Sequence, residues 1–348
     1  MSHILDKVLD RINSITSAKI EGEEHVIMNK QGYKPYPITP ENFHKIVSVE
    51  SDNKIAFVDG GNIEILASSN FSLQLVRTYY NIFQDNKKIR AQLFEFFVLV
   101  YSVIKSNEIY YDFEIFPVKG SLDLEKVSFS STDNSICMGN NRATPSKVVE
   151  VIRRLLELKT VELLIGMLDN GDIIVLDGSL ESKTGQERLI LESIYDKSRP
   201  LGIIVAGLAK TSRWFTNKGN NLLPLLASIS PEWNWYYYPI VNIDDDNYMA
   251  DVYLVKLHQR SDYVFRLEVH NGPKYNVGIL LDLLARNSVD PVFLGYPYGL
   301  VDADKFARVS NREKEMIEAR LLMKSSKSFK TLKKHLSSIN AHNLLDSV

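Results

Sequence analysis

IAFVDGG, residues 55–61, places four apolar residues directly before an aspartate and two glycines. A similar stretch, IIVLDGS, follows at residues 173–179. Short aliphatic runs of this kind indicate buried β-strands, and an aspartate that ends such a strand lies at the rim of an α/β sheet, where ligands bind. The small residues behind it leave room for a phosphate or a metal ion to approach the backbone. Because Asp-Gly is also a common turn dipeptide, Asp59 and Asp177 are predicted to be either turn residues or site residues.

The composition is that of an ordinary globular chain. Its 348 residues are 45% hydrophobic and 24% charged, with a formal net charge of −2, so a nucleic-acid site has to be a local basic patch. The single cysteine, Cys137, excludes an intramolecular disulfide and fits a reducing, cytoplasmic location. The charged start of the chain does not resemble a signal peptide. No apolar run reaches the ~20 residues of a membrane helix, so we expect no membrane partner.

Helical and strand patterns alternate along the chain, which favours an α/β fold. Apolar residues at helical spacing predict an amphipathic helix over residues 4–15. A second helix is predicted from Pro145, with Thr144 as its N-cap, to about residue 168. Residues 61–130 give a mixed pattern, in which AQLFEFFVLVYSVI fits a helix or a strand. We therefore expect one α/β domain with a large insertion at 61–144.

The C-terminal half of the chain is predicted to hold a hairpin and a long helix. YMADVYLVKL and DYVFRLEVH flank a short polar turn and indicate two antiparallel strands. Residues 291–323 predict a strand that leads into the long helix. Ser310 and Glu313 form a capping box within it, which indicates a break near residue 309.

The helix from Pro145 offers a third carboxylate. Glu162 lies near the centre of its apolar stripe, whereas Arg153 and Glu157 lie on the opposite, solvated face, where they can pair at i, i+4. A glutamate on a buried face has to be neutralised, hydrogen-bonded or bound to a metal. The alternative is that Glu162, near the helix end, reaches water.

Three carboxylates in this pattern point to a hard metal ion. Asp59, Glu162 and Asp177 offer oxygen ligands without supporting thiols, which favours Mg²⁺ or Mn²⁺ over Zn²⁺. Several carboxylates around two such ions are the usual arrangement for in-line cleavage of a phosphodiester. We expect the three side chains to converge at one end of the sheet.

Four motifs in this order resemble the NurA family of DNA-end-processing nucleases: FVDGG, ELLIGMLDNGDIIVLDGSL, AGLAKTSR and LGYPYGLVDADKFARVS. The resemblance covers roughly residues 50–310, and residues 61–144 match poorly. It implies an RNase H-like mixed sheet flanked by helices and a DNA nuclease that uses Mn²⁺ or Mg²⁺, with two ions expected. It also implies a homodimer that works with a HerA-like hexameric ATPase. The domains implied are a helix and lead-in loop at 1–50, the nuclease at 51–310 and a basic helical segment at 311–348.

The resemblance also assigns roles by position. Asp59, Glu162 and Asp177 match the family's metal-binding carboxylates, and Asp304 matches a fourth acidic position at the end of the GYP segment. Lys210 would lie beside the scissile phosphate, although an ordinary strand-end lysine is the alternative. Finally, the resemblance implies DNA contacts for Arg213 and Tyr296; the alternative for Tyr296 is packing within a Gly-Tyr-Pro turn.

Two other classes of protein fit parts of the sequence. An ATP-binding enzyme of the actin and sugar-kinase type also carries Asp-x-Gly loops, but DGGN lacks the Ser or Thr that usually contacts phosphate. A non-catalytic dimeric adaptor of a ring ATPase is the other alternative. For a nuclease, both repair resection and anti-phage defence remain open. The helix at 4–15 and the basic C-terminal segment are the candidates for dimer or ATPase contacts.

Overall fold

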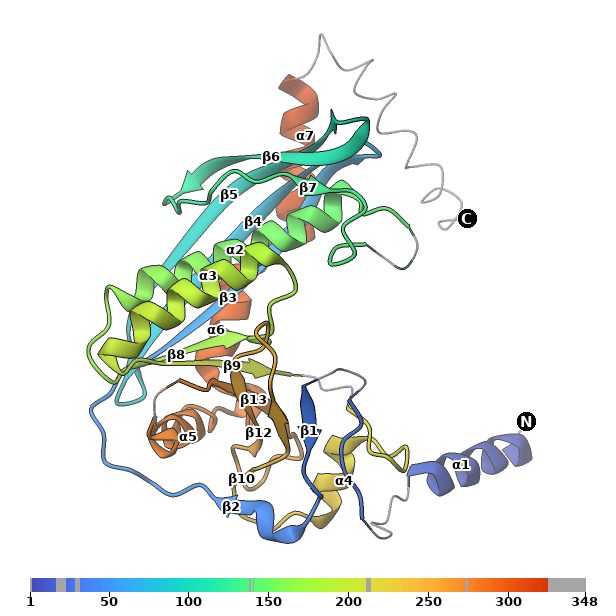
Figure 1. The fold of residues 1–348 in the computed structure, drawn as a ribbon, viewed down its shortest axis with the longest axis vertical. Coiled ribbons are helices and arrows are strands. Elements are labelled where there is room, and N and C mark those ends of the chain that lie inside the picture. The colour runs from blue at the N-terminus through green and yellow to red at the C-terminus, as the bar shows by residue number, and fades with distance from the viewer. Residues whose placement is uncertain are drawn as a thin grey trace. The chain divides into compact units, whose positions relative to one another are not determined.

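Helices and strands form most of the part of the chain that the structure describes. This computed structural model describes residues 2–16, 23–28, 32–137, 139, 141–210, 214–272 and 275–324. It divides into two units, and Figure 1 labels the helices and strands of both. The first unit comprises Met1–Glu50, Gly178–Glu181 and Ala206–Pro297, and the second comprises Ser51–Asp177, Ser182–Val205 and Tyr298–Val348.

A mixed sheet forms the core of the second unit. Its strands, in spatial order, are β8 (Ile173–Asp177), β3 (Ile55–Ser68), β4 (Phe71–Gln84), β5 (Lys87–Lys105), β6 (Glu108–Lys119) and β7 (Phe129–Ser130). β8 runs parallel to β3, and the other neighbours are antiparallel. Since helices flank this sheet, the predicted α/β class is confirmed.

The expected insertion at 61–144 contributes most of this sheet. β3 continues without a break through the DGG motif, and Asp59 pairs with Tyr79 of β4, so the expected turn or strand end at Asp59 is wrong. The ambiguous segment AQLFEFFVLVYSVI lies in β5, where burial alternates along the strand. Two-residue turns connect these long strands: Asp85–Asn86 joins β4 to β5, and Ser106–Asn107 joins β5 to β6. All four turn residues have positive φ angles, as tight hairpin turns require.

Helices cover both faces of β3 and β4. α2 (Pro145–Ile165) packs on β3, β4 and β5, and α3 (Gly185–Ser198) lies beside it (Figure 1). On the other face are α6 (Tyr298–Ala307) and α7 (Asn311–Lys324), both of which contact β3. Two predicted helix starts are confirmed: Thr144 accepts a hydrogen bond from the Lys147 amide, and Ser310 forms its capping box with Glu313.

The first unit has an antiparallel sheet. Its strands, in order, are β2 (Phe43–Lys45), β10 (Trp235–Tyr237), β12 (Ala250–Lys256), β13 (Phe265–His270) and the end of β9 (Ile204–Ala209). β12 and β13 form the predicted hairpin. β1 (Tyr33–Pro35) and β11 (Val241–Ile243) form a separate pair, and the helices are α1 (Ser2–Thr16), α4 (Leu222–Ile229) and α5 (Val277–Arg286). The strand expected near residue 291 is wrong, since Pro291–Phe293 form a 3₁₀ turn.

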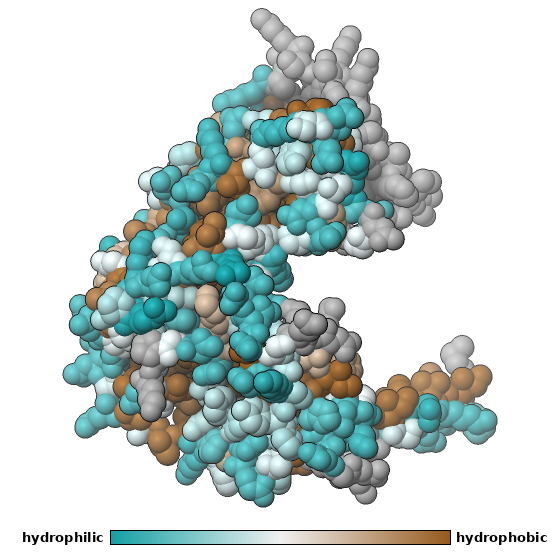
Figure 2. Space-filling view, viewed as in Figure 1, coloured by the Kyte–Doolittle hydropathy of each residue, from teal (hydrophilic) through white to brown (hydrophobic). Residues whose placement is uncertain are grey.

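Helix α1 confirms the first predicted helix, and its apolar side is exposed. Hydrophobic side chains gather along one side of it (Figure 2). The exposed fractions of these residues are 66% for Ile4, 55% for Leu5, 47% for Val8, 56% for Leu9, 48% for Ile12 and 64% for Ile15. In the described part of the chain, no helix is both long and apolar enough to cross a membrane.

Candidate active site

Asp59 and Asp177 lie at neighbouring positions of two parallel strands. The register of β3 and β8 pairs Val58 with Leu176 at its last printed position, so the next residues on the two strands are the aspartates. Adjacent strands lie ~4.8 Å apart, and register partners in parallel strands direct their side chains to the same face. Both aspartates are partly exposed, and an Asp59 carboxylate oxygen accepts a hydrogen bond from the Gly60 amide at 2.7 Å. The structure thus brings two of the predicted carboxylates together.

The two glycines of DGG allow helices to approach β3 from opposite faces. A Cβ at Gly60 would lie 2.7 Å from Cγ of Glu157 on α2, and a Cβ at Gly61 would collide with the carbonyl of Ala307 on α6. Since alternate residues of a strand face opposite sides, Asp59 shares the α6 side with Gly61. The glycines therefore serve helix packing, rather than the approach of a ligand that the sequence suggested.

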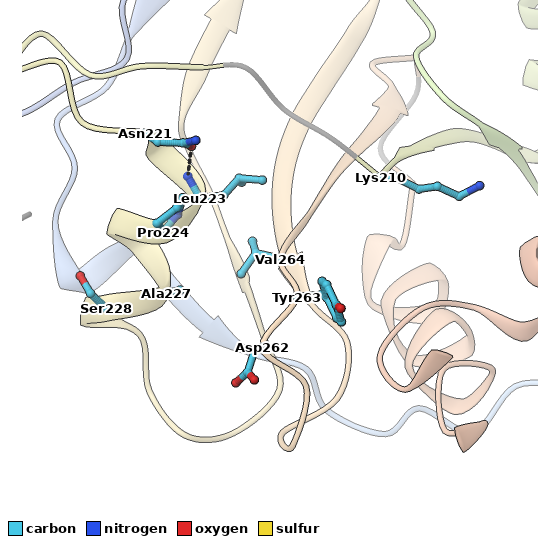
Figure 3. A pocket seen from close by; sticks show the side chains of 9 residues that line it. All are labelled: Lys210, Asn221, Leu223, Pro224, Ala227, Ser228, Asp262, Tyr263 and Val264. Carbon is cyan, nitrogen blue, oxygen red and sulfur yellow. Dashed lines mark hydrogen bonds between the residues drawn. The ribbon is translucent and has the colours of Figure 1, made fainter. Parts of the chain in front are cut away.

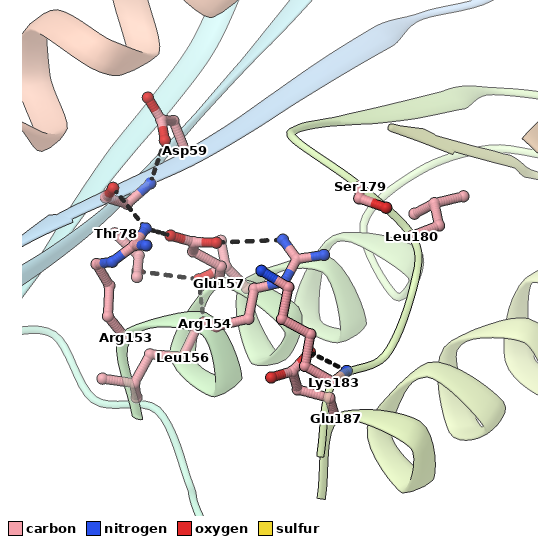
Figure 4. Close-up of polar contacts among 12 residues, drawn as sticks. Asp59, Thr78, Arg153, Arg154, Leu156, Glu157, Ser179, Leu180, Lys183 and Glu187 are labelled. Atoms are coloured by element: carbon pink, nitrogen blue, oxygen red, sulfur yellow. Dashed lines mark hydrogen bonds and ion pairs between the residues drawn. The ribbon is translucent and has the colours of Figure 1, made fainter. Parts of the chain in front are cut away.

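Glu157 is the α2 carboxylate that reaches β3. It is only 3% exposed, so its expected position on a solvated face is wrong. Arg153 confirms the predicted i, i+4 pair with it and also donates to the Gly60 carbonyl at 3.0 Å. Arg154 donates to the second Glu157 oxygen at 3.2 Å (Figure 4). Attraction to Glu157, and to a smaller extent to Asp59, raises the pKa of Arg153. These partners compensate the buried carboxylate.

Glu162 lies away from this arrangement and connects α2 to α3. It accepts hydrogen bonds from Lys159 at 2.8 Å, from Ser193 at 2.8 Å and from Lys197. Partial burial by itself raises the pKa of Glu162, but these hydrogen bonds outweigh it and lower the pKa to about 2. The expectation that Glu162 converges with Asp59 and Asp177 is therefore wrong.

Helix α2 is buried on most of its circumference, because the sheet covers one side of it and α3 covers another. Its buried residues include Val149, Leu156, Glu157 and Val161 as well as the predicted stripe. A single apolar stripe therefore does not mark the side that faces β3. The signal that was available is the pair Arg153 and Arg154, which precedes Glu157 by four and three residues and provides the countercharges of a buried carboxylate.

The fourth candidate carboxylate lies on α6. Asp304 pairs with Arg308 at 2.9 Å, on the helix that packs against the Asp59 side of β3. Its neighbour Asp302 is buried and accepts hydrogen bonds from Tyr79, Asn81 and Lys88. Across the ranges that the structure describes, no group of three His, Cys, Asp or Glu residues is arranged to hold a metal ion. The observed arrangement is a pair of aspartates with one carboxylate on each flanking helix.

The remaining predicted residues belong to the first unit. Lys210 follows β9, lies with its Nζ atom 5.4 Å from the centroid of the Tyr296 ring, and lines a cavity of about 700 Å³ (Figure 3). Tyr296 is 1% exposed and packs against Phe265 and Phe293, with ring centroids 5.1 and 5.0 Å away. The Tyr296 side chain is too deeply buried to contact DNA, so the packing alternative is confirmed. Arg213 lies outside the described residues.

Comparisons with known proteins show which family the chain belongs to. A model of the NurA domain matches residues 53–309. The crystal structure of the NurA nuclease from Sulfolobus solfataricus is similar at 14% sequence identity and a TM-score of 0.56, over 94% of this chain and 98% of that chain. The catalytic domain of human endonuclease V matches at 12% identity and a TM-score of 0.37, over 77% and 84% of the two chains. A search of curated proteins gives no match. Because the domain model spans well over half of the sequence, the chain belongs to the NurA family.

Proposed function

We propose that the protein is a DNA nuclease that hydrolyses phosphodiester bonds with Mn²⁺ or Mg²⁺. The observation that carries this proposal is the pair Asp59 and Asp177, at neighbouring positions of two parallel strands. Carboxylate oxygens are the ligands that such ions prefer, so the donor chemistry of the pair fits. When bound, ions of this kind activate water and stabilise charge on the phosphate oxygens.

Two further carboxylates, one on the helix at each face of the sheet, would complete the set of ligands. Glu157 takes the role that the sequence gave to Glu162, because it is the glutamate of α2 that lies against β3. Its two arginine partners keep the carboxylate in one orientation against Gly60. Asp304, on the helix packed over the Asp59 side of the sheet, is the fourth candidate. Lys210 is proposed as the cation beside the scissile phosphate.

We further propose that the protein acts as a homodimer with a HerA-like ring ATPase. Non-specific affinity for DNA comes mainly from neutralisation of phosphates by Lys and Arg, and a net charge of −2 supports only weak binding by the chain alone. An ATPase that delivers the strand would overcome this weakness. Repair resection and anti-phage defence are both consistent with an activity of this kind.

The decisive experiment is cleavage of linear single- and double-stranded DNA with Mn²⁺, with Mg²⁺ or with a chelator. We expect metal-dependent cleavage by the wild-type protein. Asp59→Asn and Asp177→Asn should each lower it by roughly a hundredfold or more, since loss of a ligand removes several kcal/mol of charge stabilisation. Their thermal unfolding should be unchanged or slightly raised, because one of two neighbouring negative charges is removed.

Two results would contradict the proposal. Wild-type protein that never cleaves DNA, even with the ATPase present, would favour the adaptor, and ATP binding by the isolated chain would favour the kinase-like alternative. Retained Mn²⁺-dependent cleavage by either aspartate variant would show that the site lies elsewhere.

A further inference from the structure

The turn that follows Asp177 is held by a buried carboxylate with no assigned role. Glu268 lies on β13 and is 0% exposed. One of its oxygens accepts hydrogen bonds from the Ser179 hydroxyl at 2.9 Å and from the Leu180 amide at 2.6 Å. Ser179 and Leu180 are the residues that follow the second Asp-Gly motif (Figure 4). The serine of DGS therefore has a specific partner, although DGG has no serine at the matching position.

The other oxygen of Glu268 faces a cation. Arg266 Nε lies 2.8 Å away, and the Arg266 side chain is 15% exposed. The two residues are two positions apart on β13, so both side chains lie on the same face of the strand. Burial of a carboxylate is costly unless it is paired and hydrogen-bonded. Glu268 has both compensations: Oε1 is paired with Arg266, and Oε2 accepts the two hydrogen bonds of the turn.

The backbone of the turn is also fixed against β9. The Gly178 amide donates to the Leu208 carbonyl at 2.9 Å, and a Cβ at Gly207 would lie 2.6 Å from the Gly178 carbonyl. Gly207 is the register partner of Glu268. The positive φ of 109° at Gly178 suits glycine alone. Hydrogen bonds from two strands thus define the path of the chain directly after Asp177.

We propose that Glu268 is a positioning residue for the nuclease: by holding Ser179 and Leu180, it sets the orientation in which the Asp177 carboxylate is presented. The inference rests on the proposed function, since it gives Asp177 the role of a metal ligand. Residues that orient metal ligands typically contribute about 10–100-fold to metal affinity or activity. A purely structural Glu268 would contribute to stability and leave metal affinity unchanged.

The test compares Glu268→Gln and Ser179→Ala with the control Glu187→Gln. Glu187 is also a buried glutamate, and it accepts from the Lys183 amide at 3.1 Å, farther along the same connection. Three quantities are measured: hydrogen exchange of the Leu180 amide without metal, Mn²⁺ affinity by calorimetry, and DNA cleavage. For Glu268→Gln we expect faster exchange at Leu180 and roughly tenfold or greater losses of Mn²⁺ affinity and cleavage. The control should stay within about twofold of the wild type in all three measurements.

Ser179→Ala keeps the buried ion pair, so it decides the question if Glu268→Gln does not fold. We expect it to weaken Mn²⁺ binding by a few-fold while the Leu180 hydrogen bond persists. Wild-type Mn²⁺ affinity in Ser179→Ala, and in Glu268→Gln despite its faster exchange at Leu180, would overturn the positioning role and leave the proposed nuclease intact. A wild-type protein that neither binds Mn²⁺ nor cleaves DNA would instead overturn the proposed function itself.

Discussion

The missing side chain at Gly60 allows the charged Glu157 carboxylate to be buried against β3. Gly60 leaves space beside β3 that the Glu157 carboxylate occupies, and a carboxylate in this position needs countercharges because it is 3% exposed. Arg153 and Arg154 provide them from the preceding turn of the same helix. Gly60 makes room for the Glu157 carboxylate, and Arg153 and Arg154 hold it there. Glu157 is therefore a fixed acidic group beside Gly60, the residue that follows Asp59.

The proposal that Glu157, and not Glu162, is the site residue of α2 can be tested directly. Glu157→Gln should lower metal-dependent cleavage by roughly a hundredfold. It should also reduce the free energy of unfolding by about 1–3 kcal/mol, because two guanidinium groups lose a charged partner. Glu162→Gln should retain cleavage within a few-fold. Cleavage is measured with Mn²⁺ at fixed protein concentration. If Glu162→Gln cleaves more slowly than Glu157→Gln, Glu162 and not Glu157 is the site residue.

Glu162 should instead show its role in the pH dependence of stability. Its folded-state pKa is about 2, against an ordinary value of 4.5. The stabilisation is therefore fully present above pH ~4.5, where the group is ionised in both states, and is lost as the pH falls toward 2. At pH 7 we expect Glu162→Gln to cost about 1 kcal/mol, since partly exposed pairs are screened by water. Urea unfolding at pH 7 and pH 3 measures the effect, and a difference that grows at pH 3 would contradict it.

At the scale of elements, the distance between β3 and α2 depends on Gly60. Gly60→Ala places a methyl group against Glu157, whose carboxylate cannot move easily because two arginines hold it. We expect a loss of about 1–3 kcal/mol of stability, together with a fall in cleavage that resembles the effect of Glu157→Gln.

Gly185→Ala is the matched control for this change. Gly185 is the first residue of α3, and a Cβ there would meet nothing within 4 Å. This variant should be neutral or stabilising by about 0.4–1 kcal/mol, with unchanged cleavage. If thermal unfolding ranks the two variants equally, the close packing of α2 on Gly60 does not limit the site.

At the scale of the whole molecule, assembly is expected to depend on α1. Its six exposed apolar side chains form a contiguous stripe, and apolar patches of this kind usually mark interaction surfaces. We expect a dimer by light scattering at micromolar concentration, and deletion of residues 1–18 should weaken assembly more than Mn²⁺ binding. Val8→Asp should act in the same direction.

Asn13→Asp adds the same charge to the polar side of α1 and should leave assembly unchanged. A wild-type monomer, or a truncated protein that still couples to the ring ATPase, would exclude α1 as the assembly surface. Equal losses in Val8→Asp and Asn13→Asp would indicate a general effect of charge rather than loss of an apolar contact.

The sequence by itself determined the parts of this protein that depend on local pattern. Aliphatic runs predicted the first residues of β3 and the whole of β8, caps at Thr144 and Ser310 predicted two helix starts, and the two Asp-Gly motifs identified the aspartates at neighbouring strand positions. Tertiary structure decided the rest, because periodicity reports that a residue is buried and not which neighbour buries it. Helix α2 is covered both by the sheet and by α3, so its apolar stripe could not show that Glu157 faces β3 while Glu162 faces the lysines. For the same reason, only the fold placed Tyr296 in the core and Glu268 beneath the turn after Asp177.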